Sequence, residues 1–255
     1  MPKRWTKEQT IVVFNLYCKI PFRKASSTHP DIIRIAKLIG RSPNSVKMKI
    51  GNFGSFDPEL KKRGIVGLSN TSKLDEEVWN EFNDNWDELA YESEQLIAEF
   101  SEEELERSSK NNLEDIPEGE ERETIIKARV NQNFFRQSVL SAYNLKCCIT
   151  GIQIPQLLVA SHIKPWSRCN NKTEKTNPRN GLCLNSLHDK AFDSGLITIT
   201  PNFKIKVSKQ KFADDSSKII NDWFRNINGE KIEVPERFLP EISFLEYHNS
   251  EVFKN

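Results

Sequence analysis

The sequence has little of what marks a membrane, secreted or fibrous protein. No apolar run approaches the roughly 20 residues needed to cross a bilayer, and the basic start MPKRWTKEQT does not lead us to expect a secretory signal. Only five of 255 residues are cysteine, an odd number at irregular spacing, which argues against a disulfide framework. Ten glycines exclude a collagen-like chain. We therefore expect a globular, cytoplasmic protein with no membrane partner.

The chain also lacks net charge, because 37 Lys and Arg residues face 36 Asp and Glu residues, for a formal charge of +1. This balance hides an uneven distribution. Residues 1–72 carry a net charge of +10, residues 73–125 carry −16, and residues 126–255 carry +7. Two basic blocks around an acidic block indicate an anionic partner such as nucleic acid. The alternative is that the acidic segments are only solvated helix faces.

The first basic block, residues 1–72, has the pattern of a small helical DNA-binding domain. Thr6 and Gln9 have the spacing of a capping box, which predicts that a helix begins there. A second helix is expected near 30–39, followed by a turn at Gly40 and a third helix over 45–50. This succession is typical of a helix-turn-helix. The alternative is a three-helix core whose exposed lysines only keep it soluble. The residues expected to contact DNA are Lys47, Lys49 and Asn52.

The acidic block, residues 73–123, has apolar residues at helical spacing from Leu74 to Phe100, with acidic residues on the other faces. We expect an amphipathic helical connector, followed by a polar linker at 108–119. One hypothesis is that its acidic face imitates DNA and covers a basic surface. The alternative is a packing or dimerisation helix between two domains.

The last block, residues 124–255, places polar residues on a hairpin and a helix. A helix is expected over 124–144, and a short β run at 156–161 brings His162 to the end of a strand. The segment Asn180-Gly181-Leu182 follows a polar loop and leads into a helix, which is followed by a strand at 196–200. The pattern predicts a hairpin and then a helix. The helix carries His188, Asp189 and Asp193.

This order and spacing resemble the HNH nuclease superfamily, whose core is the ββα-metal fold. The motifs that carry the resemblance are Ala-Ser-His-Ile-Lys-Pro-Trp at 160–166, Asn-Gly-Leu at 180–182, and Leu-His-Asp-Lys-Ala-Phe-Asp-Ser-Gly-Leu-Ile at 187–197. Residues 45–58 are similar to the region before this domain in restriction-type HNH proteins. The resemblance implies an α+β protein with a helical N-terminal domain and a C-terminal HNH nuclease domain with an extension. It also implies a defence nuclease that cleaves double-stranded DNA, with modified bases as a candidate target.

The resemblance also implies roles for the polar residues. His162 would be the general base, since a neutral histidine accepts protons readily near pH 7. Asn180 would orient the loop that carries His162, or touch the metal or the phosphate. His188 would bind one divalent ion, with Asp193 or its neighbour Asp189 adding an oxygen ligand. The ion would be Mg²⁺ or Mn²⁺, with Zn²⁺ and Ni²⁺ as alternatives. The residues expected to bind phosphates in this domain are Lys164, Arg179 and Lys190.

The sequence departs from the family pattern at Ser161, where many HNH proteins have an acidic residue or a histidine. In many of them the helix ligand lies nine positions after the asparagine, which is Asp189 here, on the same helical face as Asp193. The ligand set therefore stays open. A catalytically decayed HNH protein that regulates by binding DNA is the alternative function. One ββα site cuts one strand, so double-strand cleavage would require a homodimer or two passages.

Overall fold

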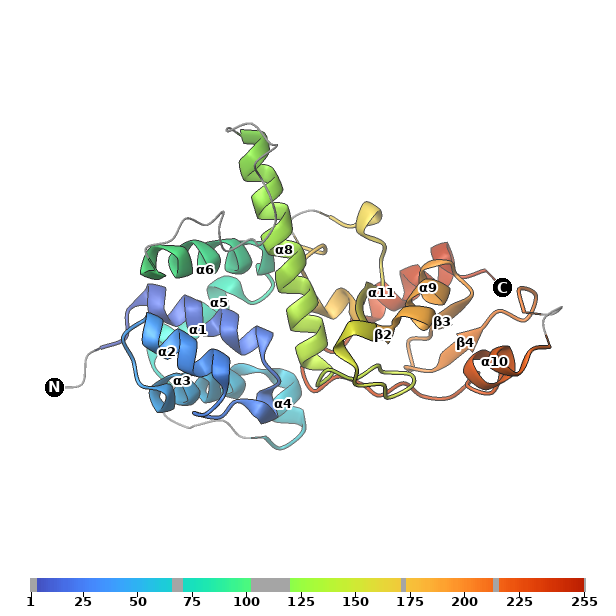
Figure 1. Ribbon diagram of the computed structural model, residues 1–255, viewed down its shortest axis with the longest axis horizontal. Helices are drawn as coiled ribbons and strands as arrows, with labels where there is room; N and C mark the ends of the chain where they lie inside the picture. Colours follow the sequence, from blue (N-terminus) through green and yellow to red (C-terminus); the bar gives the residue numbers. More distant parts are fainter. Residues whose placement is uncertain (1–3, 66–70, 102–119, 171–172, 213–215, 255) are drawn as a thin grey trace. The chain divides into compact units, whose positions relative to one another are not determined.

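The computed structural model describes residues 4–65, 71–101, 120–170, 173–212 and 216–254. The chain divides into two compact units, residues 1–141 and 142–255 (Figure 1). The expected linker at 108–119 lies outside the described residues, and the expected boundaries at 72/73 and 123/124 stay predictions. In the described residues, no helix is both long enough and apolar enough to cross a membrane.

The first unit is helical throughout its described part. Its elements are α1 (Lys7–Lys19), η1 (Phe22–Lys24), α2 (Pro30–Leu38), α3 (Pro43–Phe56), α4 (Pro58–Lys62), α5 (Lys73–Phe82), α6 (Trp86–Ser101) and α8 (Glu120–Ala142), whose last residue already belongs to the second unit.

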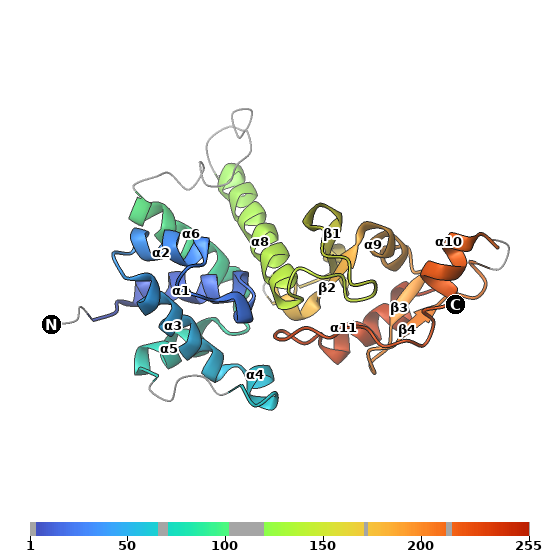
Figure 2. The ribbon, with the colours of Figure 1, turned by 60° about the horizontal axis from the view of Figure 1, so that its bottom comes forward.

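Helix α1 forms the centre of this unit. Ten consecutive residues, from Gln9 to Cys18, are buried, and a helix that is buried on all sides must be surrounded by other elements. Helices α2, α3, α5 and α6 pack against it (Figures 1 and 2). The Phe14 ring contacts Phe53 of α3 at 4.7 Å and Trp79 of α5 at 5.3 Å between ring centroids. The aromatic residues of three helices therefore meet in one core.

The expected helices of the basic block are present. The Thr6 hydroxyl accepts a hydrogen bond from the Gln9 backbone, and the Gln9 side chain accepts one from the Thr6 backbone, which confirms the capping box. Helix α2 ends before Gly40, which adopts a φ of +64° that an L side chain rarely tolerates. Helix α3 continues six residues beyond the expected end at 50, because Phe53 extends its buried face.

The two acidic helices α5 and α6 pack on α1 within the first unit. Trp86, at the start of α6, stacks on Phe134 of α8 with 6.4 Å between ring centroids. The described part of the predicted connector is therefore integrated into the core of this unit through its apolar side.

The second unit combines two small antiparallel sheets with short helices, so the chain as a whole is α+β. Its elements are η2 (Pro155–Leu157), β1 (Leu158–His162), η3 (Trp166–Arg168), η4 (Pro178–Asn180), β2 (Gly181–Asn185), α9 (Ser186–Asp193), β3 (Ile197–Ile199), β4 (Ile205–Val207), α10 (Lys218–Ile220), η5 (Asn221–Arg225), α11 (Ile242–Tyr247) and η6 (His248–Val252).

The strands pair as β1 with β2 and β3 with β4. Leu158 lies opposite Asn185, and His162 lies opposite Gly181. Helix α9 packs on both strands of the first hairpin, and η6 packs on β3. The His248 ring stacks on Phe192 of α9 with 3.7 Å between centroids. The last helical segment of the chain thus packs against α9 and β3.

Candidate active site

The hairpin β1–β2 and helix α9 together hold the polar residues of the C-terminal motif. Asn185 ends β2 and caps α9, since its side-chain oxygen accepts hydrogen bonds from the backbone of Leu187 and His188, both at 3.1 Å. The cap turns the chain sharply from strand to helix. The helix therefore folds back against the hairpin and brings its side chains toward the His162 end of β1.

His162 contacts the backbone of the loop between the strands. Its Nε2 lies 2.9 Å from the carbonyl oxygen of Lys175, which can only accept, so Nε2 carries the proton. The ring lies nearly perpendicular to the Trp166 ring, with 5.4 Å between the centroids. Burial lowers the pKa of His162, and the Lys175 carbonyl opposes this by raising it. The ring is therefore neutral at pH 7, with its lone pair on Nδ1.

Asn180 fastens the same loop. It is fully buried, and its Oδ1 accepts a hydrogen bond from the Lys164 backbone at 2.8 Å. Its Nδ2 donates to the carbonyl oxygens of Lys164 and Glu174, each at 3.3 Å, and to the sulfur of Cys169 at 3.2 Å. Because Glu174 directly precedes Lys175, Asn180 positions the carbonyl that holds His162.

Asp189 and Asp193, one turn apart on α9, form an acidic pair. Burial raises the pKa of the Asp189 carboxyl, while the Ser161 hydroxyl and the Lys190 ammonium lower it. Burial and the negative charge of Asp189 raise the pKa of Asp193. The buried Ser161 hydroxyl lies close enough to influence Asp189, yet it makes no hydrogen bond of normal geometry within the described structure. The two carboxylates therefore repel one another, with the Ser161 hydroxyl beside Asp189 and the Lys190 ammonium acting on both.

His188 does not join this group, which corrects the predicted ligand set. It is fully buried; its Nε2–H donates to the Trp223 carbonyl at 2.9 Å, and its Nδ1 accepts from Asn185 Nδ2 at 2.8 Å. Its ring stacks on Trp223. Both nitrogens are engaged in the core, so neither binds a metal in this arrangement. Consecutive helical positions differ by about 100°, which turns Asp189 toward Ser161 when His188 faces the core.

The residues expected to bind phosphates in this unit differ in their surroundings. The Lys164 ammonium is paired with Glu174 at 2.6 Å and lies over the Tyr247 ring at 5.4 Å, so it stabilises the loop and is not presented to phosphate. Arg179 is partly buried, and its carbonyl accepts from the Glu241 backbone. Lys190 is exposed on α9 and acts electrostatically on both members of the acidic pair.

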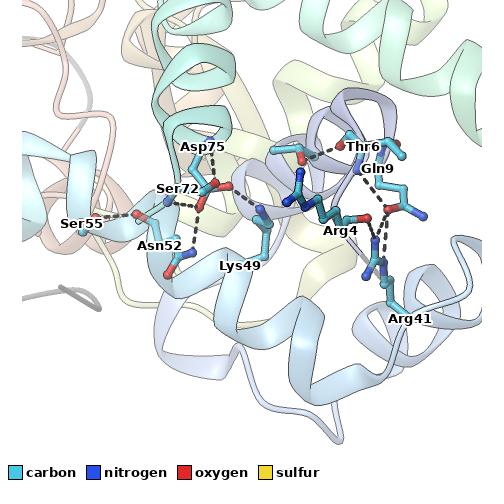
Figure 3. Close-up of polar contacts among 10 residues, drawn as sticks. Arg4, Thr6, Gln9, Arg41, Lys49, Asn52, Ser55, Ser72 and Asp75 are labelled. Atoms are coloured by element: carbon cyan, nitrogen blue, oxygen red, sulfur yellow. Dashed lines mark hydrogen bonds and ion pairs between the residues drawn. The ribbon is translucent and has the colours of Figure 1, made fainter. Parts of the chain in front are cut away.

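The residues of the first unit that were predicted to contact DNA also differ in their surroundings. Lys47 is exposed, as expected. Lys49 is only 3% exposed and its ammonium pairs with the Asp75 carboxylate, while Asn52 Nδ2 donates to the same carboxylate at 2.8 Å (Figure 3). Both side chains are directed at the start of α5. The expectation that Lys49 contacts DNA is therefore corrected, because its buried ammonium is paired with Asp75, while the contact of the partly exposed Asn52 with DNA stays a prediction.

Two residues that contribute to the site were not predicted. Lys175 acts through its backbone carbonyl, which any residue type would supply, so the sequence has no signal for it. Asn185 had a signal that could have been used, since an asparagine immediately before a helix with three polar residues is typical of an N-cap.

Comparison with known proteins agrees with this geometry. Residues 147–200 match a family model described as HNH endonuclease, and this range contains β1, β2, α9 and β3. Nuclease activity is thereby supported at the level of the family, which generally uses a divalent metal. Among curated proteins, none matches the chain. The restriction-type subgroup and the helix-turn-helix domain stay predictions.

Proposed function

We propose that the protein is a divalent-metal-dependent endonuclease that hydrolyses phosphodiester bonds of double-stranded DNA. The observation that carries the proposal is the neutral His162 ring, oriented by the Lys175 carbonyl on the hairpin against which α9 carries an acidic pair. The HNH match supports the same reaction class. Defence against foreign DNA is the biological role that the resemblance to restriction-type proteins suggests.

His162 is the general base in this proposal. With Nε2–H donating to Lys175, the lone pair on Nδ1 takes a proton from the attacking water. The lowered pKa keeps the ring in its basic form at neutral pH. Asn180 acts indirectly, by holding the loop whose carbonyl fixes both the ring orientation and the tautomer.

Asp189 and Asp193 would hold the metal ion, with the Ser161 hydroxyl beside them. The described residues contain no cluster of three or more His, Cys, Asp or Glu side chains that could hold one. Two carboxylates nevertheless suit Mg²⁺ or Mn²⁺, which are often bound by one or two carboxylates together with water and substrate phosphate. Such an ion, when bound, neutralises charge on the phosphate and on the leaving oxygen. The two carboxylates one turn apart and the Ser161 hydroxyl beside Asp189 supply the oxygen ligands that such an ion prefers.

The substrate phosphate would approach beside the acidic pair, where the exposed Lys190 ammonium can contact it. A single base and a single acidic pair act on one strand. Cleavage of both strands would require a second copy of the chain or a second passage.

Nicking of a supercoiled plasmid tests the function. The full chain should convert plasmid to the open circular form with Mg²⁺ or Mn²⁺ and not with chelator. His162→Ala and Asp189→Asn should each lower the rate at least about 100-fold, the range expected for loss of a general base or a metal ligand.

Two control variants keep the test specific. His29→Asn retains an acceptor at the start of α2 in the first unit, and Asp222→Asn removes an exposed carboxylate from the second unit; both should nick at the wild-type rate. Tight DNA binding without nicking under any metal would refute the nuclease and favour the decayed DNA-binding regulator.

A further inference from the structure

Helix α3 has one face that the core does not use. Asn44 and Lys47 are exposed, Met48 is 51% exposed, and Gly51 and Ser55 are partly exposed. These positions recur at intervals of three and four residues, so they form one continuous stripe along the helix. The stripe therefore combines an amide, a cation and an apolar side chain.

The orientation of this stripe is fixed from the opposite side. Val46, Ile50 and Phe53 are buried in the core. Lys49 and Asn52 are tied to Asp75, which also accepts from the Ser72 backbone at 3.2 Å (Figure 3). Rotation of α3 about its axis would therefore break a buried ion pair, so the exposed face keeps a fixed orientation.

The charge around the stripe indicates the kind of partner. Over residues 4–65, ten lysines and arginines are exposed, against one exposed acidic residue, Glu8. No ion pair to Lys47 is found among the described residues. A surface with this excess of positive charge is complementary to a polyanion.

Two elements that pack on α3 add cations beside it. The Phe22 ring of η1 lies so close to Gly54 that a Cβ there would come within 2.5 Å, which places the exposed Lys24 near α3. Helix α4 packs on α3 as well and carries the exposed Lys61. The stripe is thus accompanied by lysines from neighbouring elements.

We propose that the solvent face of α3, formed by Asn44, Lys47, Met48 and Gly51, binds the major groove of duplex DNA. An α-helix is about as wide as this groove. Lys47 contacts a phosphate, Asn44 is placed for a base edge, and Met48 offers apolar contact such as a thymine methyl accepts. Lys24 and Lys61 contact phosphates beside the helix. The proposal rests on the proposed function only in taking DNA as the ligand.

Salt-dependent DNA binding tests the proposal. The full chain carrying His162→Ala is titrated, in chelator, into a labelled 30-base-pair duplex of random sequence, and fluorescence anisotropy is followed at several salt concentrations. Loss of one phosphate contact lowers the slope of log K against log salt by about 0.9, which is about eight-fold in affinity at 0.1 M salt. Lys47→Ala should show this change. The double variant Lys24→Ala, Lys61→Ala should show about twice the change in slope.

The control is Lys7→Ala, which removes an exposed lysine of α1 that is already paired with Glu81. It should leave the slope unchanged, and circular dichroism should show that all variants are folded. Equal slopes for Lys47→Ala and Lys7→Ala, or no binding by the parent protein, would overturn the proposal.

Plasmid nicking separates this proposal from the proposed function. If DNA binding depends on Lys47 but the wild-type protein never nicks the plasmid, the nuclease function is rejected and the DNA-binding face of α3 is supported. If the protein nicks the plasmid but its DNA binding is unchanged by substitution of Lys47, Lys24 and Lys61, the nuclease function is supported and the DNA-binding face of α3 is rejected.

Discussion

Replacement of Asn180 by alanine tests how the loop positions the general base. The buried amide makes one short hydrogen bond to the Lys164 backbone and three longer contacts, two of which reach the carbonyl oxygens of Lys164 and Glu174. In Asn180→Ala the Lys164 N–H loses its acceptor, and the segment before Lys175 loses its anchor. The substitution should therefore affect both folding and catalysis.

The two effects have different expected sizes. A buried donor left without an acceptor costs about 1–3 kcal/mol, so we expect the free energy of unfolding to fall by about 2 kcal/mol. A shift of the Lys175 carbonyl misplaces the His162 ring, and a displacement of about 1 Å can reduce a rate about 100-fold. The carbonyl also raises the pKa of His162. Its loss should therefore move the acid limb of the pH–rate profile to lower pH.

The assay combines urea unfolding with plasmid nicking between pH 5 and 8. The matched control is Asn249→Ala, which removes side-chain hydrogen bonds to the carbonyl oxygens of Ile199 and Leu245 in the same unit. Asn249→Ala should lower the free energy of unfolding and leave the nicking rate unchanged. A folded Asn180→Ala protein with a rate within three-fold of wild type and an unmoved acid limb would refute the positioning role.

Two further predictions concern stability. Burial lowers the pKa of His248 from 6.5 to about 4, so between these pH values the unfolded chain binds a proton that the folded chain does not. The contribution of His248 to the free energy of unfolding should therefore be highest above pH 6.5 and fall by about 3 kcal/mol as the pH drops from 6.5 to 4. In His248→Gln, urea unfolding at several pH values should show a flatter dependence on pH, and a curve equal to that of the wild type would contradict this. Asp75→Ala leaves the buried Lys49 ammonium unpaired, which should cost about 3–5 kcal/mol. In a double-mutant cycle, Lys49→Met should restore much of that loss, and additive effects would show that the pair is not coupled.

Much of the fold was predictable because local signals agree with the packing. The Thr6 capping box and the glycine after α2 lie where the sequence places them, and the strand expected over 156–161 is present as Leu158–His162, after a 3-10 turn at Pro155–Leu157. The hairpin and helix of the second unit follow from the order of the motifs. The fine geometry of the site was not predictable, because His162 is oriented by a backbone carbonyl 13 residues away and Asn180 bonds mainly to backbone atoms.

The misassigned residues share one physical cause, which is that a side chain's chemistry does not reveal which way it faces. His188 was expected at the metal because histidine is a common ligand, but the neighbouring Asp189 occupies the face toward Ser161.

Lys49 was expected at DNA because lysines on a recognition helix pair with phosphates. Its spacing from Val46 and Phe53 already placed it on the buried side of α3. The partner that makes its burial tolerable, Asp75, lies 26 residues further along the chain on another helix. Helical periodicity was therefore the better guide to direction here, and a lysine on the apolar side of a helix is itself a reason to search for a distant carboxylate.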